Sequence, residues 1–292
     1  MNGLKTNANI NKMRVKIPTF ADKSALFAYL RKNEAGIIKQ KKSLPIKSDI
    51  FEWGCLPVNK KSRVKDDGSM LGPDEIQVDA IANLSGWCDS YMDVMIKDNW
   101  NKTISDKAIV YHLKNHEYST DDIVGKDPEL YTKVLPMEYF GITSDVTKAQ
   151  ALMMRSIVPK EYDKKTFALY RDNQIKQHSI GLRYIQIVLC LDSTLEEDAV
   201  YKKNWDKYYP IVINKDVVDT YHYFFAVIES QILENSCVLF GANKNTGVYS
   251  TTGKKDKLAD GESPDDDCPD EDDLEEEKAA DEAPPKKIIY YN

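Results

Sequence analysis

The chain has few cysteines, and none of them forms a closely spaced pair. Its 292 residues include five cysteines and no CxxC sequence. An odd number of widely spaced cysteines argues against a disulfide framework, and the absence of CxxC argues against a zinc site. We therefore expect reduced thiols, with Cys190 and Cys237 in core strands. The sequence predicts no metal and no other cofactor.

Long apolar runs are also missing. The longest, such as residues 223–228, are far too short to cross a bilayer. Residues 1–18 are polar and basic, without the apolar segment of a secretory signal. These observations predict a protein without a membrane partner that stays in a cytoplasm.

Charge is distributed unevenly along the chain. Residues 1–65 carry 15 Lys/Arg and 4 Asp/Glu, whereas residues 253–292 carry 6 and 15. The segment between them is mildly acidic, and the whole chain has a net charge of −7. The lysines of the first segment lack interleaved aromatic residues and any named motif, so a nucleic-acid partner is not expected.

Composition divides the chain into four parts. We interpret residues 1–65 as a basic arm with an amphipathic helix near residues 20–43, which Thr19 could cap and which packs on the body or on a partner. Residues 66–75 read as a linker, and residues 76–250 as the folded domain. Residues 251–292 are too acidic and too poor in apolar residues to fold alone, so we expect a disordered tail.

The apolar pattern of the domain predicts both strands and helices. Strands are predicted near residues 76–83, 91–96, 108–113, 179–191 and 223–240. Helices are predicted near residues 162–175 and 214–221, and residues 149–158 fit either state. Because strands and helices do not alternate regularly, the predicted class is α+β with a mostly antiparallel, barrel-like β core flanked by helices.

Three short segments carry residue types suited to serine acyl transfer. Ser179 supplies a hydroxyl nucleophile at the start of a predicted strand, His116 a base after another strand, and Glu234 a carboxylate inside a third. His112 competes for the role of base, as Glu229 does for that of the acid. His178 is a poor base because neighbouring residues of a strand point to opposite faces.

The residues around Ser179 do not support an α/β-hydrolase. Ser179-Ile180-Gly181 is not the GxSxG elbow of α/β-hydrolases. Gly181 lacks a Cβ and could let a substrate backbone approach. From position alone, a backbone N–H near Gly181, or a group near Arg183, could stabilise the oxyanion.

At this point the motifs resemble those of the caudovirus prohead serine proteases, also called capsid maturation proteases, which are similar in fold to the herpesvirus assemblins. The matching segments occur in the same order over about residues 76–250. They are Ile81–Ser90, Asp93–Ile96, Asn115-His116, Ser179-Ile180-Gly181, Glu234–Val238 and Gly241-Ala242-Asn243.

The resemblance implies a function as well as a fold. It implies Ser179 as nucleophile, His116 as general base and acid, and Glu234 as the third catalytic member. Substrates would be the scaffold, the protease itself and a major capsid precursor, inside the assembling prohead in the host cytoplasm. Self-association is also what the resemblance suggests.

Two other functions stay open at the level of sequence. One is a non-catalytic head-assembly or scaffold protein that kept the fold, for which an acidic disordered tail is equally suitable. The other is a serine hydrolase that acts on small esters. The reactivity of Ser179 separates the first from a protease, and a protein-substrate assay separates the second.

Overall fold

The protein is described by a computed structural model. It describes residues 15, 17–43, 59–61, 71–239 and 245–252. The chain divides into two units, Met1–Lys254 and Lys255–Asn292, and all described residues belong to the first. Residues 66–70 of the expected linker and residues 253–292 of the expected acidic tail lie outside the described residues.

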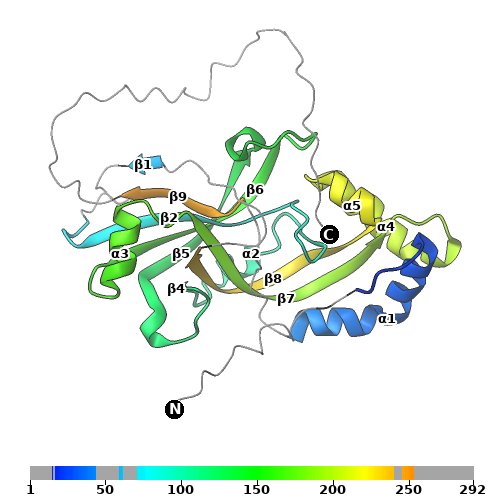
Figure 1. The fold of residues 1–292 in the computed structure, drawn as a ribbon, viewed down its shortest axis with the longest axis horizontal. Helices are drawn as coiled ribbons and strands as arrows, with labels where there is room; N and C mark the ends of the chain where they lie inside the picture. The colour runs from blue at the N-terminus through cyan, green and yellow to red at the C-terminus, as the bar shows by residue number, and fades with distance from the viewer. Residues whose placement is uncertain (1–14, 16, 44–58, 62–70, 240–244, 253–292) are drawn as a thin grey trace, which may run out of the picture. The chain divides into compact units, whose positions relative to one another are not determined.

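A sheet of nine strands forms the centre of the described part (Figure 1). The strands are β1 (Asn59–Lys61), β2 (Glu75–Leu84), β3 (Asp93–Met95), β4 (Tyr111–Lys114), β5 (Ile123–Pro136), β6 (Lys148–Pro159), β7 (Gln177–Leu191), β8 (Tyr223–Val238) and β9 (Gly247–Thr252). Their spatial order is β1-β9-β2-β6-β5-β4-β8-β3, and β7 pairs with the other edge of β8.

The sheet is mixed and open, which confirms the α+β class and corrects the expected barrel. Strands β7 and β8 pair antiparallel over their whole length, whereas β3 and β4 both pair parallel with β8. The short strands β3 and β4 thus pair with the same edge of the long strand β8. Strand β7 pairs with the opposite edge of β8 and is the last strand on that side of the sheet. The sheet therefore does not close on itself through a continuous ladder.

Several of the long strands are buried on both faces. Nine of the ten residues of β2 are buried, and β6 and the first half of β8 are almost as fully buried. The buried residues of β2 include Gln77, Asp79 and Asn83, so its sequence alternates although both of its faces are covered. This burial settles the ambiguous segment at 149–158, which is the strand β6.

The strand β5 is not predicted by the sequence pattern. Its segment IVGKDPELYTKVLP contains Gly125, Asp127 and Pro128, which are depleted in strands. The pairing of β5 with β6 shifts between Lys126 and Glu129, and Asp127 has a φ of 50°. A bulge therefore accommodates the turn-forming residues, so that the strand continues past them.

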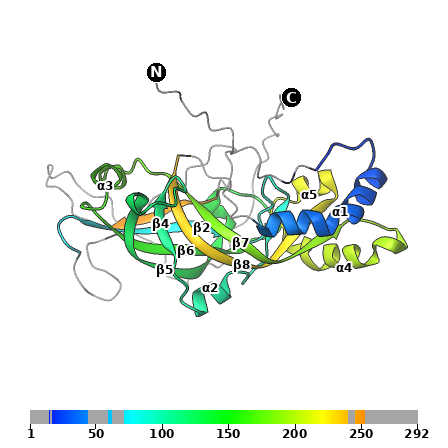
Figure 2. The ribbon, with the colours of Figure 1, turned by 90° about the horizontal axis from the view of Figure 1, so that it is seen from below.

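Helices surround the sheet. They are α1 (Lys23–Ser43), α2 (Asn101–Ser105), α3 (Lys164–Arg171), α4 (Ala199–Tyr208) and α5 (Lys215–Tyr221). Figures 1 and 2 show α1, α4 and α5 gathered at one end of the β7–β8 pair, away from α3. Helices α2 and α4 are not among the predicted elements, whereas the positions of the other three are confirmed.

Helix α1 is part of the folded body. Its residues Phe27, Leu30 and Ile37 are buried in the largest apolar cluster, together with side chains of β7 and β8. The helix begins at Lys23, and the Asp22 carboxylate accepts a hydrogen bond from the Ala25 N–H at 2.8 Å. The cap is therefore Asp22, and the expected capping role of Thr19 is wrong.

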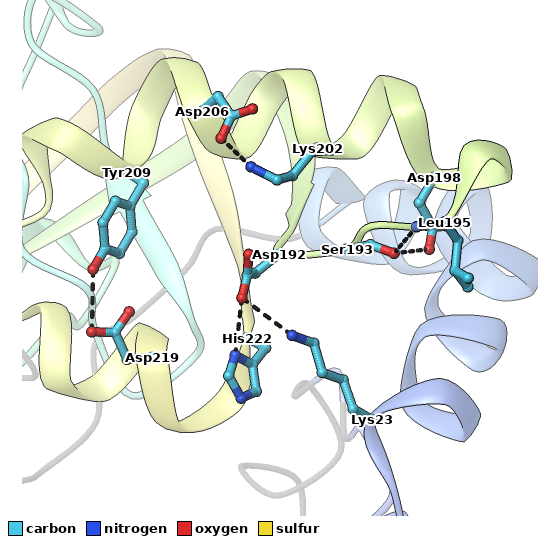
Figure 3. Close-up of polar contacts among 10 residues, drawn as sticks. All are labelled: Lys23, Asp192, Ser193, Leu195, Asp198, Lys202, Asp206, Tyr209, Asp219 and His222. Carbon is cyan, nitrogen blue, oxygen red and sulfur yellow. Dashed lines mark hydrogen bonds and ion pairs between the residues drawn. The ribbon is translucent and has the colours of Figure 1, made fainter.

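Ion pairs of different burial hold α1: Arg31 pairs with Glu197 and Asp198, and two further pairs lie toward the opposite ends of the helix. The Lys41 ammonium lies 2.6 Å from Asp93 Oδ1, both residues are buried, and the Tyr184 hydroxyl donates to Asp93 Oδ2. At the other end of the helix Lys23 pairs with Asp192, which lies between Lys23 and His222 (Figure 3). The second pair is solvent-exposed and therefore contributes little.

Strand β9 ends at Thr252, two residues beyond the expected end of the domain at 250.

None of the helices in the described ranges is long and apolar enough to span a membrane.

We predict that Lys41→Ala destabilises the protein strongly, because it leaves the buried Asp93 carboxylate without its cation. The expected loss in the free energy of unfolding is about 3–5 kcal/mol, typical of a broken buried pair. Lys23→Ala is the matched control, with an expected loss of at most about 1 kcal/mol. Urea unfolding followed by tryptophan fluorescence measures both. Equal losses would contradict the anchoring role of Lys41.

Candidate functional site

Three strands bring the predicted site residues together. Glu234 lies on β8, which has β4 on one edge and β7 on the other. Ser179 is the third residue of β7 and pairs with Ser236 of β8. His116 follows the end of β4, whose Tyr111 is in register with Glu234. Strand β8 therefore places residues from both neighbouring strands around one carboxylate.

The three side chains form a continuous hydrogen-bonded chain. Glu234 Oε1 lies 2.6 Å from His116 Nδ1, and His116 Nε2 lies 2.7 Å from Ser179 Oγ. The carboxylate accepts from Nδ1–H, so Nε2 of the neutral ring is the acceptor for the serine hydroxyl. This tautomer is the one that a general base for Ser179 requires. The predicted spatial proximity of the three residues is confirmed.

All three residues are buried. Ser179 is 2% exposed, His116 6% and Glu234 0%. A carboxylate without partners would be costly at such a place. Glu234 instead accepts from His116 on one oxygen and from the Ser236 hydroxyl on the other, at 2.6 Å each. Glu229, the competing acid, lies five residues earlier on β8 and is paired with Lys102.

The turn that carries His116 has an unusual backbone. Asn115 and His116 have φ values of 55° and 57°, in the left-handed region that residues with a Cβ rarely adopt. The Asn115 N–H donates to the Cys237 carbonyl at 3.0 Å, and the His116 N–H donates to Ser236 Oγ at 3.1 Å. Strand β8 thus holds both residues of the turn.

Gly181 has a different role from the one expected. It is opposite Glu234 in the β7–β8 pairing. A Cβ at Gly181 would lie 2.0 Å from Glu234 Oε1, which no side chain can tolerate. The glycine therefore makes room for the carboxylate of the site, and the reading of Gly181 as an opening for a substrate backbone is corrected.

Arg183 lies four residues after Ser179 on β7 and is exposed. A role of Arg183, or of the Gly181 backbone, in stabilising an oxyanion stays a prediction. Tyr118, which the sequence analysis does not include, lies near the site. Its partial burial and the charge of Glu234 raise the pKa of Tyr118 to about 12, so the phenol stays protonated.

The competing histidines point away from Ser179. His178 and His112 are fully buried, and their Nε2 atoms each lie 2.9 Å from the Tyr170 hydroxyl of α3. Asn235 donates to His178 Nδ1 at 3.1 Å, and His112 Nδ1 lies 2.6 Å from Ser156 Oγ. We name this set, His112, Ser156, Tyr170, His178 and Asn235, the tyrosine-centred network.

Burial keeps both histidines of this network neutral. It lowers the pKa of His178 to about 3. Burial, with the proximity of His178, lowers the pKa of His112 well below its ordinary value. These two rings are structural at neutral pH, which leaves His116 as the histidine that contacts Ser179.

Burial makes the described cysteines poor candidates for a nucleophile. Cys88, Cys190 and Cys237 are buried free thiols, and burial raises the pKa of each, that of Cys237 to about 11. Such thiols are poor nucleophiles. Within the described ranges no group of three or more His, Cys, Asp or Glu residues has a metal-binding arrangement.

Comparison of the chain with protein-family models, with curated proteins and with solved structures finds no match in any of the three.

We predict that Gly181→Ala disrupts the site, because the new methyl group and the Glu234 carboxylate cannot occupy the same space. Overpacking of a buried position of this kind lowers the free energy of unfolding by about 1–3 kcal/mol. Gly36→Ala is the control, since Gly36 lies exposed on α1 with nothing near its added methyl group. Its expected effect is a gain of about 0.5–1 kcal/mol. Chemical denaturation measures the free energy of unfolding of each variant. A Gly181→Ala variant as stable as wild type would contradict the close packing of Gly181 against Glu234.

We predict that the tyrosine-centred network makes the protein acid-sensitive. His178 takes up a proton at about pH 6.5 when unfolded but only at about pH 3 when folded. The contribution of His178 to the free energy of unfolding is therefore complete above about pH 6.5. It declines as the pH falls to about 3, by up to about 1.4 kcal/mol per pH unit.

The measurement is the free energy of unfolding across this range for wild type, His178→Gln and His222→Gln. The pH slope is expected to be shallower in His178→Gln alone, because His222 is partly exposed. Some carboxyl groups have the opposite effect on the pH dependence of stability, such as Asp89, whose pKa burial raises to about 7. They contribute equally to all three proteins, so their effect cancels in the comparison. Equal slopes in all three proteins would show that His178 titrates normally.

Proposed function

We propose that the chain is a serine endopeptidase of the prohead, or capsid maturation, type. The observation that carries the proposal is the chain of hydrogen bonds from Glu234 through His116 to Ser179. The ordered motifs that resemble prohead proteases support the protein-cleaving class over other serine hydrolases. On this proposal the substrates are the scaffold, the protease itself and the major capsid precursor, inside the assembling prohead.

The arrangement is that of a reactive site more than of a structural polar cluster. A structural polar cluster would not require a carboxylate, an imidazole and a hydroxyl in this order. Buried titratable groups that contact one another are typical of functional sites.

The chemistry follows from the geometry. Ser179 Oγ attacks the carbonyl carbon of a peptide bond as His116 Nε2 takes its proton. The imidazolium ion that results is stabilised by Glu234 and then gives its proton to the leaving amine. An acyl-enzyme on Ser179 remains. Water attacks it with His116 again as base, which releases the acid and restores the hydroxyl.

Burial of the site bears on how it is tested. Ser179 and His116 are almost inaccessible in the described arrangement, so a protein substrate requires some opening of the surroundings. Activity is therefore best measured under head-assembly conditions, with scaffold and capsid precursor present. Self-association of the protease is a further expectation of the proposal.

We predict that Ser179→Ala abolishes proteolysis. The wild-type chain, expressed with scaffold and capsid precursor, is expected to yield shortened products by intact mass during assembly. The variant loses the nucleophile, and its rate falls on the order of 10⁶-fold, as for other serine proteases. Its unfolding transition serves as the control for folding.

Three outcomes separate the candidate functions. Cleavage of the protein substrates by wild type but not by Ser179→Ala supports the protease function. A fluorophosphonate that labels Ser179 without any protein cleavage indicates a small-ester hydrolase. Uncut wild-type and Ser179→Ala chains, which differ in mass only by the oxygen atom of the substitution, together with no labelling, indicate a non-catalytic head-assembly protein.

A further inference from the structure

Ser236 occupies a central position behind the three proposed catalytic residues. It lies on β8, in register with Ser179 of β7 on one side and with Leu113 of β4 on the other. It is two residues from Glu234, and residues two apart on a strand face the same side. Ser236 is completely buried, so its hydroxyl can bond only within the protein.

The hydroxyl of Ser236 joins two parts of the site. Its Oγ accepts from the His116 backbone N–H at 3.1 Å and lies 2.6 Å from Glu234 Oε2. The other carboxylate oxygen, Oε1, accepts from the His116 ring. His116 is therefore held at both its backbone and its side chain by one closed ring of hydrogen bonds through Ser236 and Glu234.

The direction of these bonds is determined. A backbone amide can only donate, so Ser236 Oγ is an acceptor toward His116. Its own proton is then directed to Glu234 Oε2, which lies 2.6 Å away. With a donor on each oxygen, the carboxylate cannot rotate away from the imidazole.

The same hydroxyl also holds the backbone of the turn. Asn115 and His116 both have positive φ, and both of their N–H groups donate hydrogen bonds to residues of β8. The Asn115 N–H bonds to a backbone carbonyl, which any residue provides. The His116 N–H depends on the side chain of Ser236, so this bond is lost when the hydroxyl is removed.

We infer that Ser236 is a positioning residue of the site: it orients the Glu234 carboxylate and fixes His116 relative to Ser179. The inference rests on the proposed function for its effect on rate, but its effect on geometry can be measured separately. Ser236 does not contact the scissile bond and takes no proton from the substrate. Its removal should therefore slow the chemical step more than it weakens substrate binding.

The test compares Ser236→Ala with Ser230→Ala. Ser230 is a matched control because it is also a buried serine of β8, six residues before Ser236. Its hydroxyl donates a hydrogen bond to Asn99. Loss of a hydrogen bond to a charged group corresponds to about 10- to 100-fold in rate. We expect kcat and fluorophosphonate labelling of Ser179 to fall by this factor in Ser236→Ala, with KM nearly unchanged. Ser230→Ala should leave both near wild type.

A measurement without catalysis completes the test. The imidazole Nδ1–H of His116, bonded to Glu234, should give a strongly deshielded proton signal in the wild-type protein, identified by its loss in Glu234→Gln. We expect this signal to broaden or shift in Ser236→Ala and to persist in Ser230→Ala. A role in stability alone would lower the unfolding free energy of both variants and leave the signal unchanged.

The outcomes distinguish the inference from the proposed function. If wild type neither cleaves protein nor reacts at Ser179, the proposed function fails, and the His116 signal alone decides the role of Ser236. If Ser236→Ala keeps the wild-type kcat and the wild-type signal, the positioning role is overturned while the proposed function stands.

Discussion

The hydrogen bond between Glu234 and the His116 ring is the constraint on which the site depends. A carboxylate that is fully buried on a central strand must have partners, because desolvation without them would oppose folding. The partners are the imidazole and the Ser236 hydroxyl, one on each oxygen. The absence of a side chain at Gly181 provides the space. Three features of the sequence are thus explained by one buried charge.

Strand β8 organises this constraint because its two edges are used differently. A short parallel strand, β4, lies beside its second half and ends at the His116 turn. The long antiparallel strand β7 lies on the other edge and places Ser179 beside Ser236. The residues that meet are 63 and 118 positions apart in the sequence. Only the ladder on both edges brings them together, so the geometry of the site is a property of the sheet.

The two faces of these strands give histidine opposite roles. On one face His116 lies between a carboxylate and a hydroxyl, where a proton can be taken up and returned. On the other face His112 and His178 share the Tyr170 hydroxyl in a buried setting that favours the neutral ring. Successive residues of a strand alternate between faces, so His178 and Ser179 belong to different environments although they are neighbours. The tyrosine-centred network supports the strands that carry the site.

The sequence alone determined the α+β class, the positions of most strands and the residue types of the site, because apolar runs and local spacing follow from short-range physics. It also ranked His116 above His178, since alternation along a strand is a local rule. It did not determine the open sheet or the strand β5, which depend on pairing with distant segments. The role of Gly181 was decided only by the tertiary structure, because the atom that excludes a side chain there belongs to Glu234. The link from Ser236 to His116 likewise exists only once β4 lies beside β8.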